Sequence, residues 1–183
     1  MSHLPSGNYV IINAGTEKAV GAIEVPKLLG TLAIQSTEDA SVRPNTTVCT
    51  IRCYPHASWA PDTRNSLHPC ITQFKLTHAK ENNYTVEVKG LPVVAINGEV
   101  VALVNPTVHV EWQITPLHNI PGTRQAFAIK QLRPVPKGLV GITGYGWALE
   151  KPDAGTDVTI EGLMLTGPPL FFDPLQAWVF QSV

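Results

Sequence analysis

Charge, cysteine and long hydrophobic runs are all scarce in this sequence of 183 residues. Only 15% of the residues are charged, and the 13 basic residues form no cluster that could neutralise a run of phosphates. This argues against nucleic acid as a partner, and the same reasoning applies to an anionic membrane surface. No apolar run reaches the length of a membrane-spanning helix, so we expect no membrane partner.

The scarcity of cysteine argues against a disulfide scaffold, because Cys49, Cys53 and Cys70 are an odd number. Residues 1–7 lack the basic region and the apolar core of a signal peptide. We therefore expect a cytoplasmic protein made without classical secretion. In that reducing compartment the three cysteines would be small buried apolar residues or free thiols.

Catalytic motifs are missing as well. The sequence has no G-x-S-x-G, no H-E-x-x-H, no phosphate-binding G-x-x-x-x-G-K and no G-x-G-x-x-G followed by a helix. Cys53, His56, His68 and Cys70 have a spacing that loosely resembles a zinc site, but loop residues beside prolines are the simpler interpretation. We expect no enzyme, no cofactor and no metal site.

Proline and glycine, in contrast, are abundant, since 16 prolines and 14 glycines interrupt the sequence every few residues. Such spacing favours many short strands over helices. Residues 85–89 alternate apolar and polar side chains, as a half-buried strand does. Asn97-Gly98 predicts a type I′ hairpin turn, because both central positions of that turn need a positive φ. A further strand is predicted at Val158–Leu165, with a bulge at Gly162.

One strand pattern occurs three times along the chain. Its three starts are Tyr9-Val10-Ile11, Tyr84-Thr85-Val86 and Phe127-Ala128-Ile129. Its three ends are Phe74-Lys75-Leu76, Trp112-Gln113-Ile114 and Trp178-Val179-Phe180. Self-similarity in a fixed order indicates one supersecondary unit that is repeated. Three all-β units predict a single β-trefoil domain over residues 1–183, which is a closed barrel capped by three hairpins.

The first repeat is longer than the others and carries two insertions, near Glu24–Val42 and near Cys53–Ile71. Neither stretch has a clean strand period. Loops of this length in a compact domain are usually functional or disordered, and a barrel scaffold without catalytic motifs would place its function in loops. These two insertions are therefore the first candidates for a functional surface.

The triplet Gln176-Ala177-Trp178 fits the Q-x-W pattern of ricin-type lectin trefoils. The corresponding triplets, which end at Phe74 and Trp112, do not fit it. We therefore interpret the aromatic residue of each triplet as a side chain that fills the barrel core.

Seven segments, in order, resemble the fungal β-trefoil serine protease inhibitors of the cospin and cnispin group, which are related in fold to the mycocypins. These segments are Ser6–Ile11, Glu38–Pro44, Asn83–Val86, Val94–Leu103, Gly146–Leu149, Gly155–Val158 and Thr166–Pro169. The resemblance covers most of the chain outside the two insertions. It implies a cytoplasmic fungal setting and the binding of a protease through an exposed loop.

The resemblance also implies a position for the reactive loop. The family's trypsin inhibitors use the loop between the second and third strands of the first repeat, which here falls within the first insertion. A basic residue on a rigid extended loop would enter a deep pocket that ends in a carboxylate. Family members often carry arginine where this chain has Ala40. The candidates for the reactive loops are Pro26, Lys27, Leu28, Asp39, Ala40, Ser41, Arg64 and Asn65.

From these observations we expect a monomeric protease inhibitor whose exposed loops insert into the active site of a trypsin-like serine protease. One alternative is a mycocypin-like inhibitor of papain-type cysteine proteases. Another is a non-inhibitory β-trefoil, either a lectin that binds carbohydrate or an immunomodulatory binding protein. Inhibition assays with serine and cysteine proteases and a glycan array would separate these alternatives.

Overall fold

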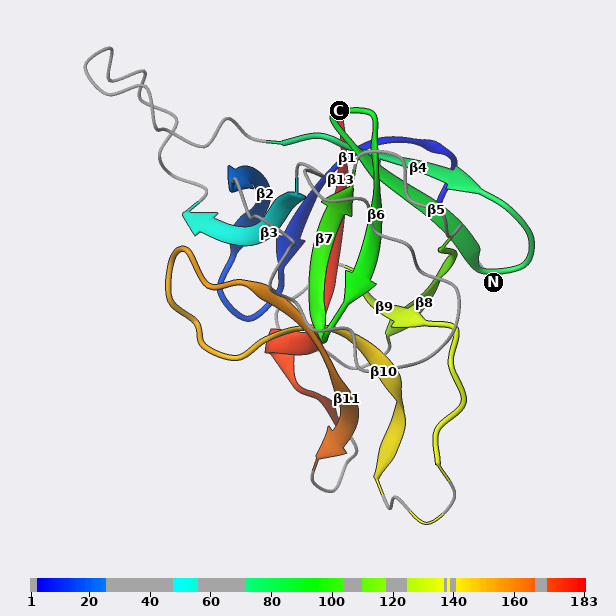
Figure 1. Ribbon diagram of the computed structural model, residues 1–183. Coiled ribbons are helices and arrows are strands. Elements are labelled where there is room, and N and C mark those ends of the chain that lie inside the picture. The colour runs from blue at the N-terminus through cyan, green and yellow to red at the C-terminus, as the bar shows by residue number, and fades with distance from the viewer. Residues whose placement is uncertain are drawn as a thin grey trace.

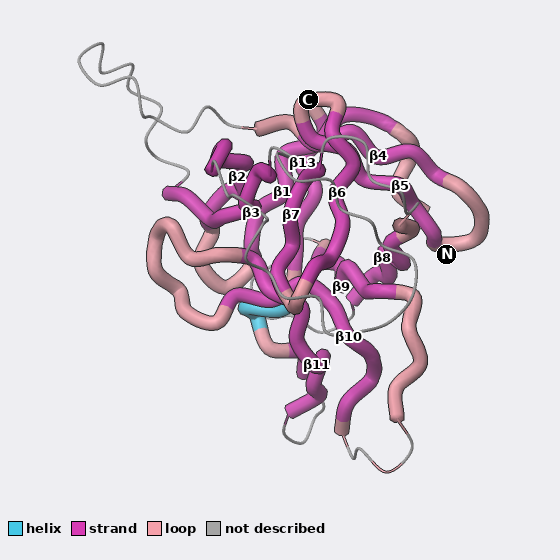
Figure 2. The backbone as a smooth tube through the Cα atoms, viewed as in Figure 1, coloured by secondary structure: helices cyan, strands magenta, loops and turns pink. Residues whose placement is uncertain are grey.

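The computed structural model describes residues 3–25, 48–55, 72–103, 110–117, 125–136, 138, 141–166 and 171–183 (Figure 1). The strands of these residues are β1 (Gly7–Asn13), β2 (Lys18–Val25), β3 (Val48–Pro55), β4 (Phe74–His78), β5 (Asn83–Val88), β6 (Leu91–Ile96), β7 (Glu99–Leu103), β8 (Trp112–Leu117), β9 (Ala126–Gln131), β10 (Ile142–Leu149), β11 (Val158–Thr166), β12 (Phe171–Phe172) and β13 (Trp178–Ser182). The 3-10 helix η2 (Pro174–Gln176) is drawn in cyan in Figure 2. No helix among the described residues is long and apolar enough to cross a membrane. The prediction of an all-β protein is confirmed.

Six strands pair in a closed ring. Its order is β1, β4, β5, β8, β9, β13 and back to β1, and every neighbouring pair is antiparallel. A ring of this kind leaves no free strand edge, and its inward side chains form a core. Each of the three starts and three ends of the repeated pattern contributes a strand to this ring.

The remaining long strands form three hairpins, β2–β3, β6–β7 and β10–β11. These hairpins also pair with one another, because β7 pairs with β3 near its end and with β11 at its start, along the edge that β6 leaves free. An isolated bridge between Arg52 and Asp157 connects β3 to the residue that precedes β11. The β6–β7 hairpin turns at Asn97 and Gly98 with φ values of 52° and 83°, which confirms the predicted turn.

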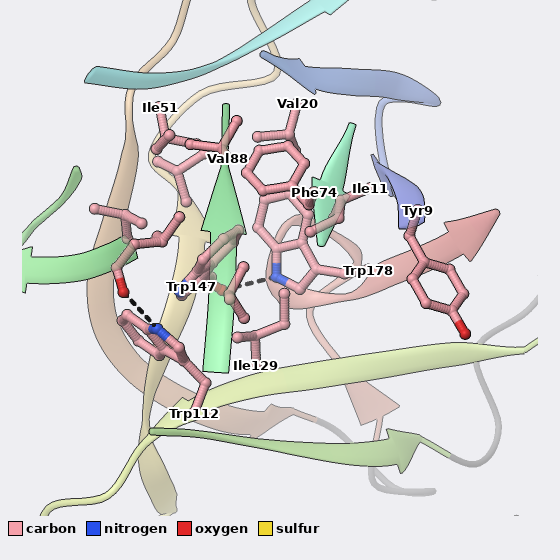
Figure 3. Close-up of a cluster of buried hydrophobic side chains, with 14 of the residues drawn as sticks. Tyr9, Ile11, Val20, Ile51, Phe74, Val88, Trp112, Ile129, Trp147 and Trp178 are labelled. Carbon is pink, nitrogen blue, oxygen red and sulfur yellow. Dashed lines mark hydrogen bonds between the residues drawn. The ribbon is translucent and has the colours of Figure 1, made fainter. Parts of the chain in front are cut away.

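The core is formed by side chains of the ring strands together with side chains of the three hairpins. Tyr9, Tyr84 and Phe127, which start the three copies of the pattern, are at most 5% exposed. The side chains that end the copies, Phe74, Trp112 and Trp178, are fully buried. Trp147 of β10 contacts these three rings edge-to-face, with centroids 6.4, 5.6 and 5.9 Å away (Figure 3). The interpretation of the three terminal aromatic residues as core residues is confirmed.

The predicted bulge at Gly162 is wrong. Gly162 pairs regularly with Tyr145, and the register of this hairpin shifts instead between Ile142 and Gly144. Gly162 has a different purpose, because a Cβ atom there would lie 3.1 Å from Cδ1 of Ile142. The glycine thus provides room for the neighbouring isoleucine side chain.

Candidate functional site

All eight reactive-loop candidates lie outside the described residues: Pro26, Lys27, Leu28, Asp39, Ala40, Ser41, Arg64 and Asn65. The structure does describe the strands that lead into the two insertions. β2 continues to Val25 and pairs there with Val48, where β3 begins. β3 continues to Pro55, which pairs with Lys18 at the start of β2. The segments 26–47 and 56–71 therefore begin at opposite ends of one hairpin.

A third loop lies beside the strand that leads into segment 56–71. This anchored loop (residues 150–157) connects β10 to β11 and is drawn in orange in Figure 1. The backbone N–H of Gly155 donates to the carbonyl of Cys53 at 2.7 Å, and the N–H of Cys53 donates to the carbonyl of Thr156 at 3.0 Å. Cys53 is two residues from the end of β3, so the anchored loop lies close to where the segment begins.

Side chains hold the anchored loop at two further points. Nε of Arg52 lies 2.5 Å from Oδ1 of Asp157 in an ion pair, and both side chains are partly exposed. The ammonium of Lys18 donates to the carbonyl of Pro152. Within the loop, the hydroxyl of Thr156 donates to the carbonyl of Asp153 at 2.9 Å. Two strands of the first hairpin therefore fix the backbone of a loop from the third.

The surface of the anchored loop faces solvent. Residues 150–154 are all exposed, while Asp157 and Gly155 at its C-terminal end are half-buried. Sequence reasoning missed this loop because it compared lengths between repeats, and the third repeat has no long insertion.

The thiol of Cys53 lies beneath this loop and is unsuited to chemistry. Burial raises its pKa from 9.0 to about 12, although the positive charge of Lys18 acts in the opposite direction. A thiol with such a pKa is neutral at physiological pH and is a poor nucleophile or metal ligand. Among the described residues no group of three or more His, Cys, Asp or Glu side chains could hold a metal ion. His56, His68 and Cys70 of the loosely zinc-like set lie outside the described residues.

The Q-x-W triplet has a structural role. Gln176 is buried, its Oε1 accepts from the backbone N–H of Met164 at 3.1 Å, and its Nε2 donates to the carbonyl of Gly162 at 3.1 Å. Both polar atoms of the side chain are thus bonded to the backbone of β11. Trp178, the last residue of the triplet, fills the core.

Solved structures with the same fold include both inhibitors and lectins. A proteinase inhibitor from Coprinopsis cinerea is 19% identical with a TM-score of 0.59, and the alignment covers 98% of this chain and 99% of that one. The ricin B-like lectin of Macrolepiota procera, solved with lactose, is 19% identical with a TM-score of 0.53 and full coverage of both chains. The Rhizoctonia solani agglutinin is 17% identical with a TM-score of 0.53, covering 100% of this chain and 99% of that one. At these identities the likeness shows the fold alone.

The family comparison is more specific than the fold. A search of curated proteins finds no significant match. The model of the peptidase inhibitor I66 family, however, matches residues 1–182. Together with the Coprinopsis cinerea structure, this match confirms the resemblance to the fungal inhibitors of the cospin and cnispin group. The chain belongs to the peptidase inhibitor I66 family.

Proposed function

We propose that this protein inhibits a serine protease of trypsin-like specificity by inserting exposed loops of a β-trefoil into the protease active site. The observation that carries the proposal is the family match over residues 1–182, which spans both insertions and all the strands. A match of this extent concerns the whole domain and not one short motif.

The β-trefoil part of the proposal is supported by the strand pairings. The chain divides into three consecutive units, which are unit 1 (β1–β4), unit 2 (β5–β8) and unit 3 (β9–β13). Each unit gives two strands to the ring and one hairpin outside it. This division follows the three starts and three ends of the sequence pattern.

A scaffold of this kind suits inhibition, because a closed ring with a dense aromatic core holds loop ends in fixed positions. A loop that is already ordered loses little conformational entropy when it enters a protease cleft. The segments 26–47 and 56–71, which contain most of the two predicted insertions, begin at paired strand ends, which fixes their bases. Lys27 and Arg64 are the basic residues of these insertions that we expect to enter a pocket ending in a carboxylate.

The test is residual protease activity in the presence of purified protein at micromolar concentration. We expect inhibition of trypsin, with weaker or no inhibition of chymotrypsin, elastase and subtilisin. Lys27→Ala and Arg64→Ala would identify the insertion that contributes the basic residue, since one of them should abolish inhibition. If none of the four serine proteases is inhibited, the proposal of a serine protease target fails.

Two other results would redirect the function. Inhibition of papain without inhibition of trypsin would make the protein a cysteine protease inhibitor, in which glycine-rich and apolar loops block the cleft. Binding on a glycan array without any inhibition would favour a lectin. The side-chain amide of Gln176 is hydrogen-bonded to the backbone of β11, so this residue gives the lectin alternative no specific support.

A further inference from the structure

Asparagine is a chemically labile residue, because its side-chain amide can be attacked by the backbone nitrogen of the next residue. The reaction requires a side-chain amide that is exposed and unbonded, and a following nitrogen with little steric bulk around it. The structure describes five asparagines that can be compared on these two requirements: Asn8, Asn13, Asn82, Asn83 and Asn97.

Two of the five asparagines have buried amides that are hydrogen-bonded. Nδ2 of Asn13 donates to the carbonyl of Leu175 at 3.0 Å. Nδ2 of Asn83 donates to the carboxylate of Glu111 at 3.1 Å. Burial and these hydrogen bonds hold both amides in place and keep them from reacting.

Two more asparagines are followed by residues whose side chains are fixed. Asn8 is exposed, but it lies within β1 and precedes Tyr9, whose ring is buried. Asn82 is half-buried and precedes Asn83, whose amide is hydrogen-bonded. In both cases a fixed side chain lies beside the nitrogen that would have to move.

Asn97 meets both requirements at the tip of the β6–β7 hairpin. Its side chain is exposed and has no hydrogen-bond partner among the described residues. The next residue is Gly98, where an added Cβ atom would meet nothing within 4 Å, so the backbone there is open to approach. The N–H of Gly98 bonds to no described residue, because the pair of Ile96 and Glu99 closes the turn.

We propose that Asn97-Gly98 is a site of spontaneous deamidation. The nitrogen of Gly98 attacks Cγ of Asn97, the new N–Cγ bond closes a succinimide ring, and Nδ2 leaves as ammonia with the proton of Gly98. Water then opens the ring. Cleavage of the new N–Cγ bond gives aspartate, whereas cleavage of the original peptide bond gives isoaspartate, in which the main chain runs through the side chain. The reaction consumes only water and is independent of the proposed inhibitory function.

The products matter because this turn connects two hairpins. The carbonyl of Gly98 accepts from the N–H of Ile160 at 2.7 Å, and Glu99 pairs with Thr159 of β11 (Figure 1). Isoaspartate adds one atom to the main chain of a two-residue hairpin loop, whose length determines the turn type. Aspartate keeps the main chain and adds only a negative charge near Glu99. Isoaspartate should therefore weaken the contact between β7 and β11 more than aspartate does.

The folded turn also controls the rate of the reaction. The pair of Ile96 and Glu99 and the bond from Ile160 to Gly98 hold the turn closed, so the attack takes place when the tip opens locally. Exposed hairpin tips open at a lower free energy than core strands do. The folded protein should therefore react more slowly than the unfolded chain, but measurably.

The test follows the full chain during incubation at physiological temperature and mildly alkaline pH. Peptide mapping by mass spectrometry locates each converted asparagine, and labelling by isoaspartyl methyltransferase quantifies isoaspartate. We expect conversion at Asn97, a higher rate in the urea-unfolded chain, and no conversion at the exposed Asn8 of the folded protein. Asn97→Gln is the matched variant, because it keeps an exposed amide whose longer side chain cannot close the same ring. Labelling at this turn should fall to background in that variant.

A second measurement tests the structural consequence of the conversion. Ion-exchange chromatography separates converted from unconverted protein, and the labelling identifies the fractions rich in isoaspartate. These fractions should melt about 2–4 °C below the unconverted protein, as expected for the loss of about one hydrogen bond. Asn97→Asp, which adds the charge without the extra main-chain atom, should lower the melting temperature by less.

Two outcomes would overturn the inference. If the unfolded chain converts at Asn97 and the folded protein does not, the turn protects this residue and is no modification site. If the isoaspartate fractions melt at the same temperature as Asn97→Asp, the extra main-chain atom does not disturb the contact between β7 and β11. Because no step involves a protease, either outcome leaves the proposed inhibitory function unchanged.

Discussion

Units 2 and 3 of the molecule contain the same kind of hydrogen bond, from an indole N–H to a backbone carbonyl. The residue that accepts this bond has a side chain of very different volume in the two units. In unit 2, Nε1 of Trp112 donates to the carbonyl of Val93 at 2.9 Å. In unit 3, Nε1 of Trp178 donates to the carbonyl of Trp147 at 3.1 Å. The carbonyl that accepts from Trp112 thus belongs to valine, a small residue. The carbonyl that accepts from Trp178 belongs to tryptophan, the largest residue of all.

The difference shows that the three units share one central volume and do not fill it equally. Trp147 occupies the space between the aromatic rings that end the three units, as Figure 3 shows. Val93 of unit 2 and Val20 of unit 1 are also fully buried in the same core cluster, but each takes up much less volume. Dense packing around a common axis requires such a mixture of large and small side chains.

The largest expected effect comes from making unit 3 like unit 2 with Trp147→Val. Removing most of the indole would leave a cavity among three rings that cannot move toward one another, so we expect a loss of about 3–5 kcal/mol in the free energy of unfolding. Denaturant unfolding, monitored by fluorescence, measures this loss in the free energy of unfolding.

Trp147→Phe is the matched control for this prediction. It keeps a ring at the centre and removes Nε1 of Trp147, which has no hydrogen-bond partner among the described residues. Its cost should be clearly smaller than that of Trp147→Val. Equal losses for the two variants would show that the centre of the core depends on the indole itself and not on filled volume.

A second prediction concerns the close approach of β10 to β9 in unit 3. A Cβ atom at Gly146 would overlap the carbonyl oxygen of Ile129 and lie 2.9 Å from Cδ1 of Leu163. Gly146→Ala should therefore push the two strands apart and cost about 1–3 kcal/mol. Gly144→Ala on the same strand is the control, because its Cβ would meet only Cδ of Lys130, at 3.6 Å. If both variants melt at the same temperature, the close approach is not a constraint.

Much of this core could be predicted from the sequence. The aromatic residues that end the three units, Phe74, Trp112 and Trp178, were predicted as core residues from their recurrence in a fixed order, and all three are fully buried. Asn97-Gly98 predicted the turn correctly because type I′ geometry depends only on the residues of the turn itself. Structural features that depend on local sequence patterns could therefore be predicted.

What could not be predicted depends on contacts between residues far apart in sequence. Nothing around Trp147 distinguishes it from a surface tryptophan, because its position at the centre results from three units meeting. The anchored loop is held by Lys18, Arg52 and Cys53, which are about a hundred or more residues away from it. The eight reactive-loop candidates remain predictions, since they lie outside the described residues.

A smaller effect tests whether units 2 and 3 use the shared hydrogen bond equally. Trp112→Phe and Trp178→Phe each remove one indole N–H and leave a buried carbonyl, and phenylalanine is the residue that unit 1 has at Phe74. We expect each variant to lose about 1–2 kcal/mol, from the missing bond and the reduced volume. Denaturant unfolding of the two variants measures the free energy of unfolding that each one loses. A large inequality between them would mean that the bond to Trp147 is stronger or weaker than its counterpart at Val93.

The smallest effect concerns unit 1, where Cys53 of β3 pairs with Val20 of β2 and carries a buried thiol. Burial raises the pKa of Cys53 from 9.0 to about 12, so between these values the folded protein holds a proton that the unfolded chain has released. The stability that this group contributes is therefore complete below about pH 9 and declines as the pH rises toward 12.

At pH 10 the free energy of unfolding of the wild type should be about 1 kcal/mol lower than at pH 8, beyond any decrease seen in Cys53→Ala. Burial also raises the pKa values of Tyr9 and Tyr84, but both proteins contain these residues, so their contribution cancels. Parallel stability curves for the two proteins between pH 8 and pH 10 would show that the thiol is accessible to solvent, and that unit 1 is packed less tightly than units 2 and 3.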